Sequence, residues 1–173
     1  ALNHLGNMLQ ETKQFQEALL CYEKIIAFQP DFPEAYFNLG NLFFHLQQDE
    51  KAHESYQKAL EIRPNYANAY ANLGFIKQKM GQLKEAIHDY QKALEIDPNL
   101  PDTWNHLGIT FDQLENSQEA LHCYEKALSL KPQFEQVLNN LGNSLQKQGK
   151  YQEAISYYQK AIDIQPNFAE AIN

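Results

Sequence analysis

Long apolar runs and cysteines are the clearest absences from this sequence. No stretch of about 18 apolar residues exists, so a transmembrane helix is excluded. Only 2 of the 173 residues are cysteine, which is too few for a disulfide-stapled scaffold. No charged segment followed by an apolar one opens the chain, so no secretory signal peptide is predicted. With 43% hydrophobic residues, the chain can instead bury an ordinary hydrophobic core.

Positive charge is also scarce. Lys and Arg number 14 against 22 Asp and Glu, which gives a net charge of −8. Nucleic-acid modules need cations to neutralise phosphates, and anionic membrane surfaces attract basic segments. We therefore expect neither nucleic acid nor a membrane among the partners.

Motifs that carry catalysis or bind cofactors are missing as well. There is no G-x-x-x-x-G-K-[ST], no G-x-G-x-x-G, no G-x-S-x-G and no H-E-x-x-H. His88 and His122 could meet across neighbouring helices, and Cys123 follows His122, but the fourth ligand that a zinc site needs is lacking. The sequence therefore predicts no catalytic residue, no metal and no cofactor in this segment.

What the sequence does contain is an internal repeat, with a period of about 34 residues. Five columns are invariant over five repeats, which excludes coincidence. The columns are Gly6, Gly40, Gly74, Gly108 and Gly142; Pro30, Pro64, Pro98, Pro132 and Pro166; Ala18, Ala52, Ala86, Ala120 and Ala154; Leu5, Leu39, Leu73, Leu107 and Leu141; and Tyr22, Tyr56, Tyr90, Tyr124 and Tyr158.

Each repeat unit is predicted to form two amphipathic helices. Trp104, Leu107 and Phe111 have the spacing of one apolar helix face, and a second such face begins at Ala120. The proline column ends each second helix, and two further prolines, Pro33 and Pro101, mark the start of a new one.

The turn inside each unit is predicted to use a left-handed residue at the end of the first helix. Gly81 and Gly149 suit this conformation, and Asn116 tolerates it. Lys13 and Gln47 occupy the turn in the first two units, where it is less well specified.

This pattern resembles the tetratricopeptide repeat (TPR) over the whole chain. The family motif W-x2-L-G-x2-Y…A-x3-F…A…P is matched in the fourth unit by Trp104, Leu107, Gly108, Phe111, Ala120, Tyr124, Ala127 and Pro132. The resemblance implies an all-α, right-handed superhelical solenoid of antiparallel helix pairs, with five repeats and a partial sixth. We expect one array with units at 1–32, 33–66, 67–100, 101–134 and 135–168 and a partial unit at 169–173, cut from a longer protein.

Packing arguments single out three residues. Cys21 and Cys123 lie three repeats apart in one column, too far for a disulfide, so free thiols and a reducing, cytoplasmic compartment are expected. Lys77 interrupts an apolar column. It either directs a cation at a ligand or covers apolar surface with its stem.

In this family the first helices line the concave face of the superhelix. The side of these helices turned away from the packing columns is thus a candidate peptide-binding groove. We assign to it Asn3, Asn7, Phe37, Asn38, Asn41, Phe44, Asn72, Phe75, Lys79, Asn105, His106, Asn139, Asn140 and Asn143.

Asparagine dominates two columns of this groove. Asn38, Asn72 and Asn140 align in one column, where His4 and His106 fill the other places. Asn7, Asn41 and Asn143 align in the second column. An amide both donates and accepts, so a row of amides suits a peptide backbone. The alternative is that these amides bond to neighbouring repeats or to water.

Two sub-types of the family are similar to this groove in part. Modules that clamp a terminal carboxylate use Lys and Arg beside two Asn, but Asn3, Asn68 and Asn72 stand where the cations are needed. The asparagine ladder of the O-GlcNAc transferase arm resembles the column of Asn38, Asn72 and Asn140.

The predicted function is a protein–protein interaction scaffold that holds an extended peptide in the groove. The alternative is a substrate-recruiting arm of a larger enzyme such as a glycosyltransferase. No polar capping repeat is evident at either end, so self-association through exposed repeat ends is a further expectation.

Overall fold

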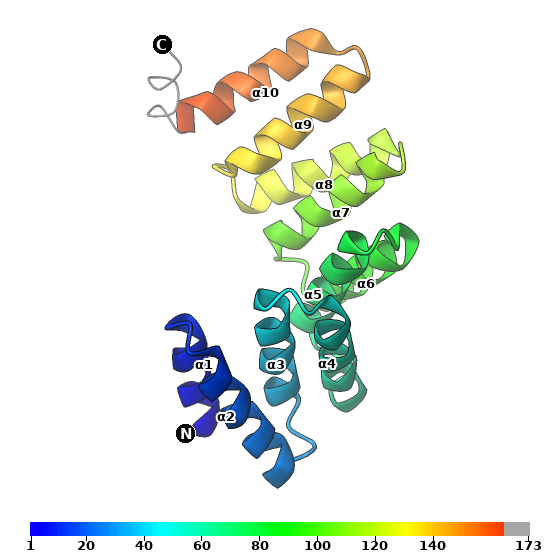
Figure 1. The fold of residues 1–173 in the computed structure, drawn as a ribbon. Coiled ribbons are helices and arrows are strands. Elements are labelled where there is room, and N and C mark those ends of the chain that lie inside the picture. Colours follow the sequence, from blue (N-terminus) through cyan, green and yellow to red (C-terminus); the bar gives the residue numbers. More distant parts are fainter. Residues whose placement is uncertain (165–173) are drawn as a thin grey trace. The chain divides into compact units, whose positions relative to one another are not determined.

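A computed structural model of the chain describes residues 1–164 (Figure 1). Over these residues the chain forms α-helices and no strand, which confirms the predicted all-α class. The helices are α1 (Leu2–Glu11), α2 (Phe15–Phe28), α3 (Pro33–His45), α4 (Asp49–Ile62), α5 (Ala67–Lys79), α6 (Leu83–Ile96), α7 (Pro101–Gln113), α8 (Ser117–Leu130), α9 (Glu135–Lys147) and α10 (Tyr151–Ile164). The predictions for Pro166, Phe168 and the partial unit 169–173 concern residues outside the described part.

The chain divides into two compact units, Ala1–Met80 and Gly81–Asn173. In the first unit, α2 packs on α1 and α3, and α4 packs on α3 and α5. In the second unit, α7 packs on α6 and α8, and α9 packs on α8 and α10 (Figure 1). The first helices of successive repeats also touch, α1 with α3 and α7 with α9. Each unit therefore stacks two helix pairs and one further helix, as expected for a solenoid, and the first helices of its two pairs lie side by side.

A tyrosine ring packed over a glycine holds the two helices of a pair together. A Cβ atom added to Gly108 would lie 2.6 Å from Cε1 of Tyr124, and one added to Gly40 would lie 2.6 Å from Cε1 of Tyr56. The tyrosines are almost fully buried, as are the alanines opposite, such as Ala120. The predicted close approach at the glycine column is thus confirmed, and the ring fills the space that the missing side chain leaves.

The turn within each helix pair has the same backbone geometry throughout. The left-handed residues are Lys13, Gln47, Gly81, Glu115 and Gly149, which occupy one column of the repeat. Around Glu115, the N–H of Glu115 donates to the carbonyl of Asp112 and the N–H of Asn116 donates to that of Phe111. These two bonds form a Schellman motif, in which the left-handed residue is the first beyond the helix.

The assignment of the left-handed position to Asn116 was wrong. Asn116 has φ −87° and precedes α8, whereas Glu115 has φ 61°. The hydrogen-bond pattern fixes which residue takes positive φ, so the repeat register outweighs the preference of asparagine for this region. Lys13, Gln47 and Glu115 consequently adopt a conformation that costs a residue with a Cβ atom about 1 kcal/mol.

Replacing Glu115 by glycine should therefore stabilise the fold by about 0.5–1 kcal/mol, because glycine adopts positive φ without the steric cost. Glu115 is exposed, so no packing is lost. Urea denaturation followed by circular dichroism measures the change. The matched control is Asn116→Gly, which should stabilise nothing because φ is already negative there. An equal gain in both variants would contradict the assignment.

Three further expectations concern the helix ends, the thiols and Lys77. Pro33 and Pro101 begin α3 and α7, as predicted. Cys21 and Cys123 are free and buried. The half-buried position of Lys77 agrees with a stem lying on apolar surface.

None of the helices within residues 1–164 is long and apolar enough to cross a membrane.

Candidate functional site

The predicted groove residues all lie on first helices of the repeats, and we call them the first-helix surface. In the first unit it comprises residues of α1, α3 and α5, and in the second unit residues of α7 and α9. Most of these side chains are half-buried, and Lys79 and Asn143 are exposed.

Amide-to-amide hydrogen bonds join neighbouring first helices on this surface. Asn38 Nδ2 donates to Asn3 Oδ1 at 2.8 Å, and Asn140 Nδ2 donates to Asn105 Oδ1 at 3.0 Å. The sequence separation is the same in both pairs, so one bond recurs in the two units. Asn105 is only 4% exposed and serves as a buried acceptor. Part of the asparagine columns thus bonds between repeats, which is the alternative that the sequence left open.

The tyrosine column orients a second set of amides. Tyr22 donates its hydroxyl hydrogen to Asn7 Oδ1 at 2.8 Å, and Tyr158 donates to Asn143 Oδ1 at 2.7 Å. Tyr56 likewise donates to Asn41 Oδ1 at 2.8 Å. Each of these asparagines therefore turns its carbonyl oxygen toward the phenol and its NH₂ group away from it.

Asn72 is bonded differently from its column. Its Nδ2 donates to Asn41 Oδ1 at 2.9 Å and lies 3.3 Å from the Tyr56 hydroxyl. Phe37 takes the place that Asn3 and Asn105 hold in other repeats, so the usual acceptor is missing there. Asn72 therefore joins the tyrosine–amide network one helix turn away.

Each unit has a cavity that is lined in part by residues of the first-helix surface. The first measures about 370 Å³ and is lined by residues that include Asn7, Asn38 and Asn41. The second measures about 210 Å³ and is lined by residues that include Asn140, Asn143 and Lys147. The first cavity thus brings together predicted amides of α1 and α3, whereas the predicted amides of the second cavity, Asn140 and Asn143, both lie on α9.

The amide atoms that form no side-chain hydrogen bond are acceptors on some of these asparagines and donors on others. Asn38 and Asn140 each donate from Nδ2, and within residues 1–164 no side chain donates to their Oδ1 atoms. Asn7 and Asn143 each accept at Oδ1, and over the same residues their Nδ2 atoms donate to no side chain. The asparagines at each cavity therefore offer an unused acceptor and an unused donor.

The phenylalanines assigned to the groove pack largely against other rings. Phe37 packs against Tyr66 and Tyr56, with ring centroids 4.9 and 5.9 Å away. Phe44 meets Phe75 edge to face at 5.5 Å. Lys79 pairs with Asp49 at 2.7 Å and lies 5.4 Å from the centroid of the Phe44 ring. These four groove residues thus pack mainly against the protein itself.

His106 is stacked on Tyr90, with ring centroids 6.2 Å apart. Burial lowers the pKa of His106, and the nearby Asp102 carboxylate partly opposes that shift. The imidazole is therefore held in its neutral form near neutral pH. Asn139 is half-buried on α9, where it lines neither cavity.

The hydrogen bonds of this surface also include Asp112, which lies on the same side of α7, and the tyrosine hydroxyls, which the sequence did not indicate. Asp112 accepts from Tyr124 at 2.9 Å and from the buried Ser144 of α9 at 3.0 Å, so it links two repeats. The sequence pattern assigns the tyrosines to packing alone. The constant spacing from Asn7 to Tyr22, and from Asn143 to Tyr158, could have indicated the pairing.

Burial raises the pKa of four column tyrosines, which keeps their hydroxyls protonated as donors. It raises the pKa of Tyr22 to about 12, and that of Tyr56, Tyr90 and Tyr124 further. Within the described part of the chain, no three His, Cys, Asp or Glu side chains gather closely enough to hold a metal ion.

Tandem helix pairs in which a tyrosine packs over a glycine, as in α3–α4 and α7–α8, define a tetratricopeptide-repeat protein. Residues 1–171 match the family model described as the Cilia and flagella-associated protein 70 C-terminal domain. The chain belongs to this family. No curated protein sequence matches it.

Solved structures show the same fold. MamA superposes with a TM-score of 0.86 at 25% identity, over 95% of this chain and 96% of that one. YrrB, described as a TPR protein with an unusual peptide-binding site, gives 0.80 at 23% identity, over 99% of this chain and 88% of that one. PilF of Pseudomonas aeruginosa gives 0.86 at 23% identity, over 94% and 74% of the two chains.

Proposed function

We propose that this chain is a protein-interaction scaffold that binds an extended segment of a partner protein along the first-helix surface. The observation that carries the proposal is the alternation of unused amide groups, an acceptor on Asn38 or Asn140 beside a donor on Asn7 or Asn143. An extended peptide offers alternating N–H and C=O groups, so each cavity can bond both.

Preorganisation supports the same function. The hydroxyls of Tyr22 and Tyr158 fix the amides before a ligand arrives, which reduces the entropy lost on binding. Cavities of about 370 and 210 Å³ accommodate single side chains of the ligand. In the right-handed superhelix that we expect, the first helices face inward, where a partner segment can follow several repeats. The peptide-binding site ascribed to YrrB agrees with this class of function.

Exchanging asparagine for aspartate tests the donors without disturbing the fold. In Asn7→Asp, Asn41→Asp and Asn143→Asp combined, one carboxylate oxygen still accepts from each tyrosine, but the unused NH₂ becomes a second acceptor. We expect this triple variant to retain its helicity and to lose partner capture by at least about tenfold, since it places unpaired acceptors against ligand carbonyls. Affinity purification from the cells that express the protein, followed by quantitative mass spectrometry, measures the loss.

The matched control carries the same three charges elsewhere. Asn65, Asn99 and Asn116 are exposed and lie outside the first-helix surface, so changing them to aspartate adds equal negative charge. This control should capture partners normally. Equal capture by the groove variant, or equal loss in both, would contradict binding at this surface.

We also propose that α1 contributes to self-association. Leu5 is 46% exposed, whereas Leu107 and Leu141 of the same column are 3% and 2% exposed. Leu2 and Met8 are exposed beside it. Leu5→Lys should therefore lower the average mass that light scattering reports at high concentration. A wild-type chain that stays monomeric at every concentration would contradict this part of the proposal.

The free, buried cysteines support a reducing, cytoplasmic setting for these interactions.

A further inference from the structure

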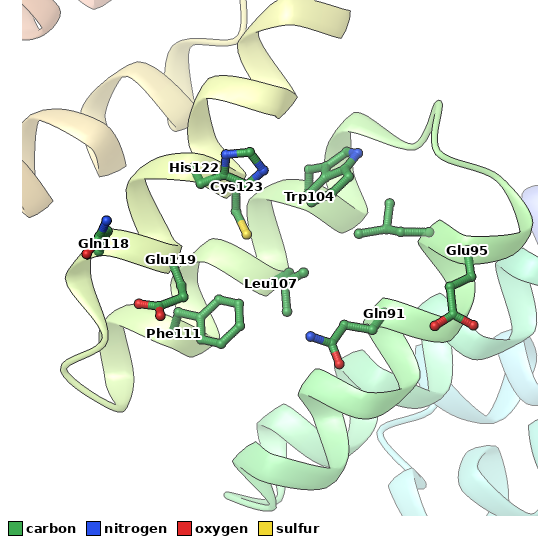
Figure 2. Close-up of a pocket in the computed structure, with 10 residues that line it drawn as sticks. Gln91, Glu95, Trp104, Leu107, Phe111, Gln118, Glu119, His122 and Cys123 are labelled. Atoms are coloured by element: carbon green, nitrogen blue, oxygen red, sulfur yellow. The ribbon is translucent and has the colours of Figure 1, made fainter.

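A hollow on the other side of the second unit is larger than either cavity on the first-helix surface. It measures about 840 Å³ and is formed by α6, α7 and α8 (Figure 2). We call it the outer pocket. Its apolar side chains are Leu94, Leu107, Trp104, Phe111 and Cys123, and its polar side chains are Gln91, Glu95, Gln118, Glu119 and His122.

The aromatic part of the outer pocket is fixed in place. The Trp104 indole donates its N–H to the carbonyl of Pro98 at 2.9 Å, and its ring meets His122 edge to face at 6.3 Å. Burial, together with the Glu119 charge, raises the pKa of the Cys123 thiol to about 12, so this wall is uncharged. Figure 2 shows Trp104, Phe111 and Glu119 around the same hollow.

A corresponding hollow in the first unit shows what these columns can hold. It measures about 450 Å³ and is lined by Tyr36, Leu39 and Phe43, which occupy the repeat columns of Trp104, Leu107 and Phe111. There the ammonium group of Lys51 lies 5.3 Å from the centroid of the Phe43 ring. The protein's own lysine thus places a cation on the aromatic wall.

The outer pocket lacks that cation and has an anion in its place. Lys51 corresponds to Glu119, and glutamate also fills this column at Glu17, Glu85 and Glu153. Of the two carboxylates at the outer pocket, Glu95 pairs with Lys92 at 2.8 Å. Within residues 1–164, no ion pair engages Glu119. No lysine or arginine of this described part lines the pocket.

We propose that the outer pocket binds an arginine side chain from a partner protein. A planar guanidinium can lie against the Phe111 ring, as the Lys51 ammonium lies near the Phe43 ring in the first unit, while it bonds to the Glu119 carboxylate. Trp104 lines the same hollow. Leu94 and Leu107 contact apolar residues next to the arginine. The site is separate from the first-helix surface, so it gives the scaffold a second point of attachment.

The single tryptophan of the chain reports on this pocket directly. The probe is acetyl-Leu-Arg-Leu-amide, and the control probe replaces arginine with its neutral isostere citrulline. We expect a saturable change in Trp104 fluorescence with the arginine peptide, and a much weaker one with the citrulline peptide. No saturable response to the arginine peptide up to millimolar concentration, or equal responses to both peptides, would overturn the proposal.

Variants of Glu119 test the charge. Glu119→Gln should weaken the arginine peptide about two- to fivefold, the range for an exposed ion pair. Glu119→Lys, which recreates the arrangement of the first unit, should abolish the response. The matched control Glu153→Lys makes the same charge reversal in the same column and should leave the response intact. Equal losses in Glu119→Lys and Glu153→Lys would overturn the site in favour of general charge repulsion.

The same variants distinguish loss of binding at the first-helix surface from loss of binding at the outer pocket. The triple variant Asn7→Asp, Asn41→Asp and Asn143→Asp should keep the Trp104 response to the arginine peptide. Loss of that response in the triple variant would overturn the separation of the two sites.

Discussion

Replacing Gly108 by alanine should destabilise the protein by about 2 kcal/mol, although alanine is the better helix former by about 1 kcal/mol. The new Cβ would lie 2.6 Å from Cε1 and 2.8 Å from Cδ1 of Tyr124. The tyrosine cannot move aside easily, because its ring is buried and its hydroxyl is bonded to Asp112. Either α7 and α8 separate or the Tyr124–Asp112 bond breaks.

Thermal denaturation followed by circular dichroism should show a melting temperature lower by roughly 4–8 °C, at about 2–4 °C for each kcal/mol. A double-mutant cycle identifies the cause. In a Tyr124→Leu background the clash is absent, so Gly108→Ala should be neutral or stabilising there. An alanine that is tolerated equally well in both backgrounds would show that the glycine column serves another purpose.

The chain should also unfold cooperatively at alkaline pH, with its stability declining from about pH 10 upward. A buried tyrosine with a raised pKa stabilises the fold fully below the pKa of the unfolded chain, about 10, and this contribution is lost as pH rises toward the folded pKa. Burial raises the pKa of Tyr22 to about 12 and shifts Tyr56, Tyr90 and Tyr124 further in the same direction. Four groups thus act together, so the effect should be large.

Tyrosine ionisation and helicity, recorded by ultraviolet absorbance and circular dichroism in one titration, measure this behaviour. Tyr22, Tyr56, Tyr90 and Tyr124, which are almost fully buried, should ionise only as the helices unfold. Tyr124→Phe removes one titrating group and its bond to Asp112, so it should cost about 1 kcal/mol at neutral pH and less as pH rises above about 10. Complete ionisation of all tyrosines with helicity intact would contradict the buried column.

The fold was predictable because each column repeats the same residue type at the same packing position in five units. The glycine and tyrosine columns indicated a close helix pair, and the contact between Gly108 and Tyr124 is that pair. The left-handed turn is predictable at Gly81 and Gly149, but in the fourth unit the sequence pattern places it one residue too late. The Schellman hydrogen bonds put the left-handed residue at a fixed position relative to the helix end. Glu115 therefore adopts the strained conformation, and Asn116 does not.

The site was predictable only in outline. Helical spacing sufficed to put the asparagines on first helices, but it does not say which partner each amide chooses. That choice depends on the residue opposite in the next repeat: Asn3 and Asn105 accept from a neighbouring amide, whereas Phe37 cannot. Likewise, the charge of the outer pocket differs from that of the first unit because Glu119 occupies the repeat position of Lys51. Only the packed structure shows which aromatic rings lie next to these two side chains.

The claim that a partner segment lies along the first-helix surface is tested most directly by position-specific cross-linking. A photoreactive benzophenone side chain replaces either Lys147, an exposed residue of α9 that lines the second cavity, or Asn65, an exposed residue before α5 that lies outside both proposed sites. A partner captured by the wild-type chain should cross-link from position 147 and not from position 65, and the linked peptide should come from one continuous segment of the partner. Cross-linking from position 65 with none from position 147 would contradict the account.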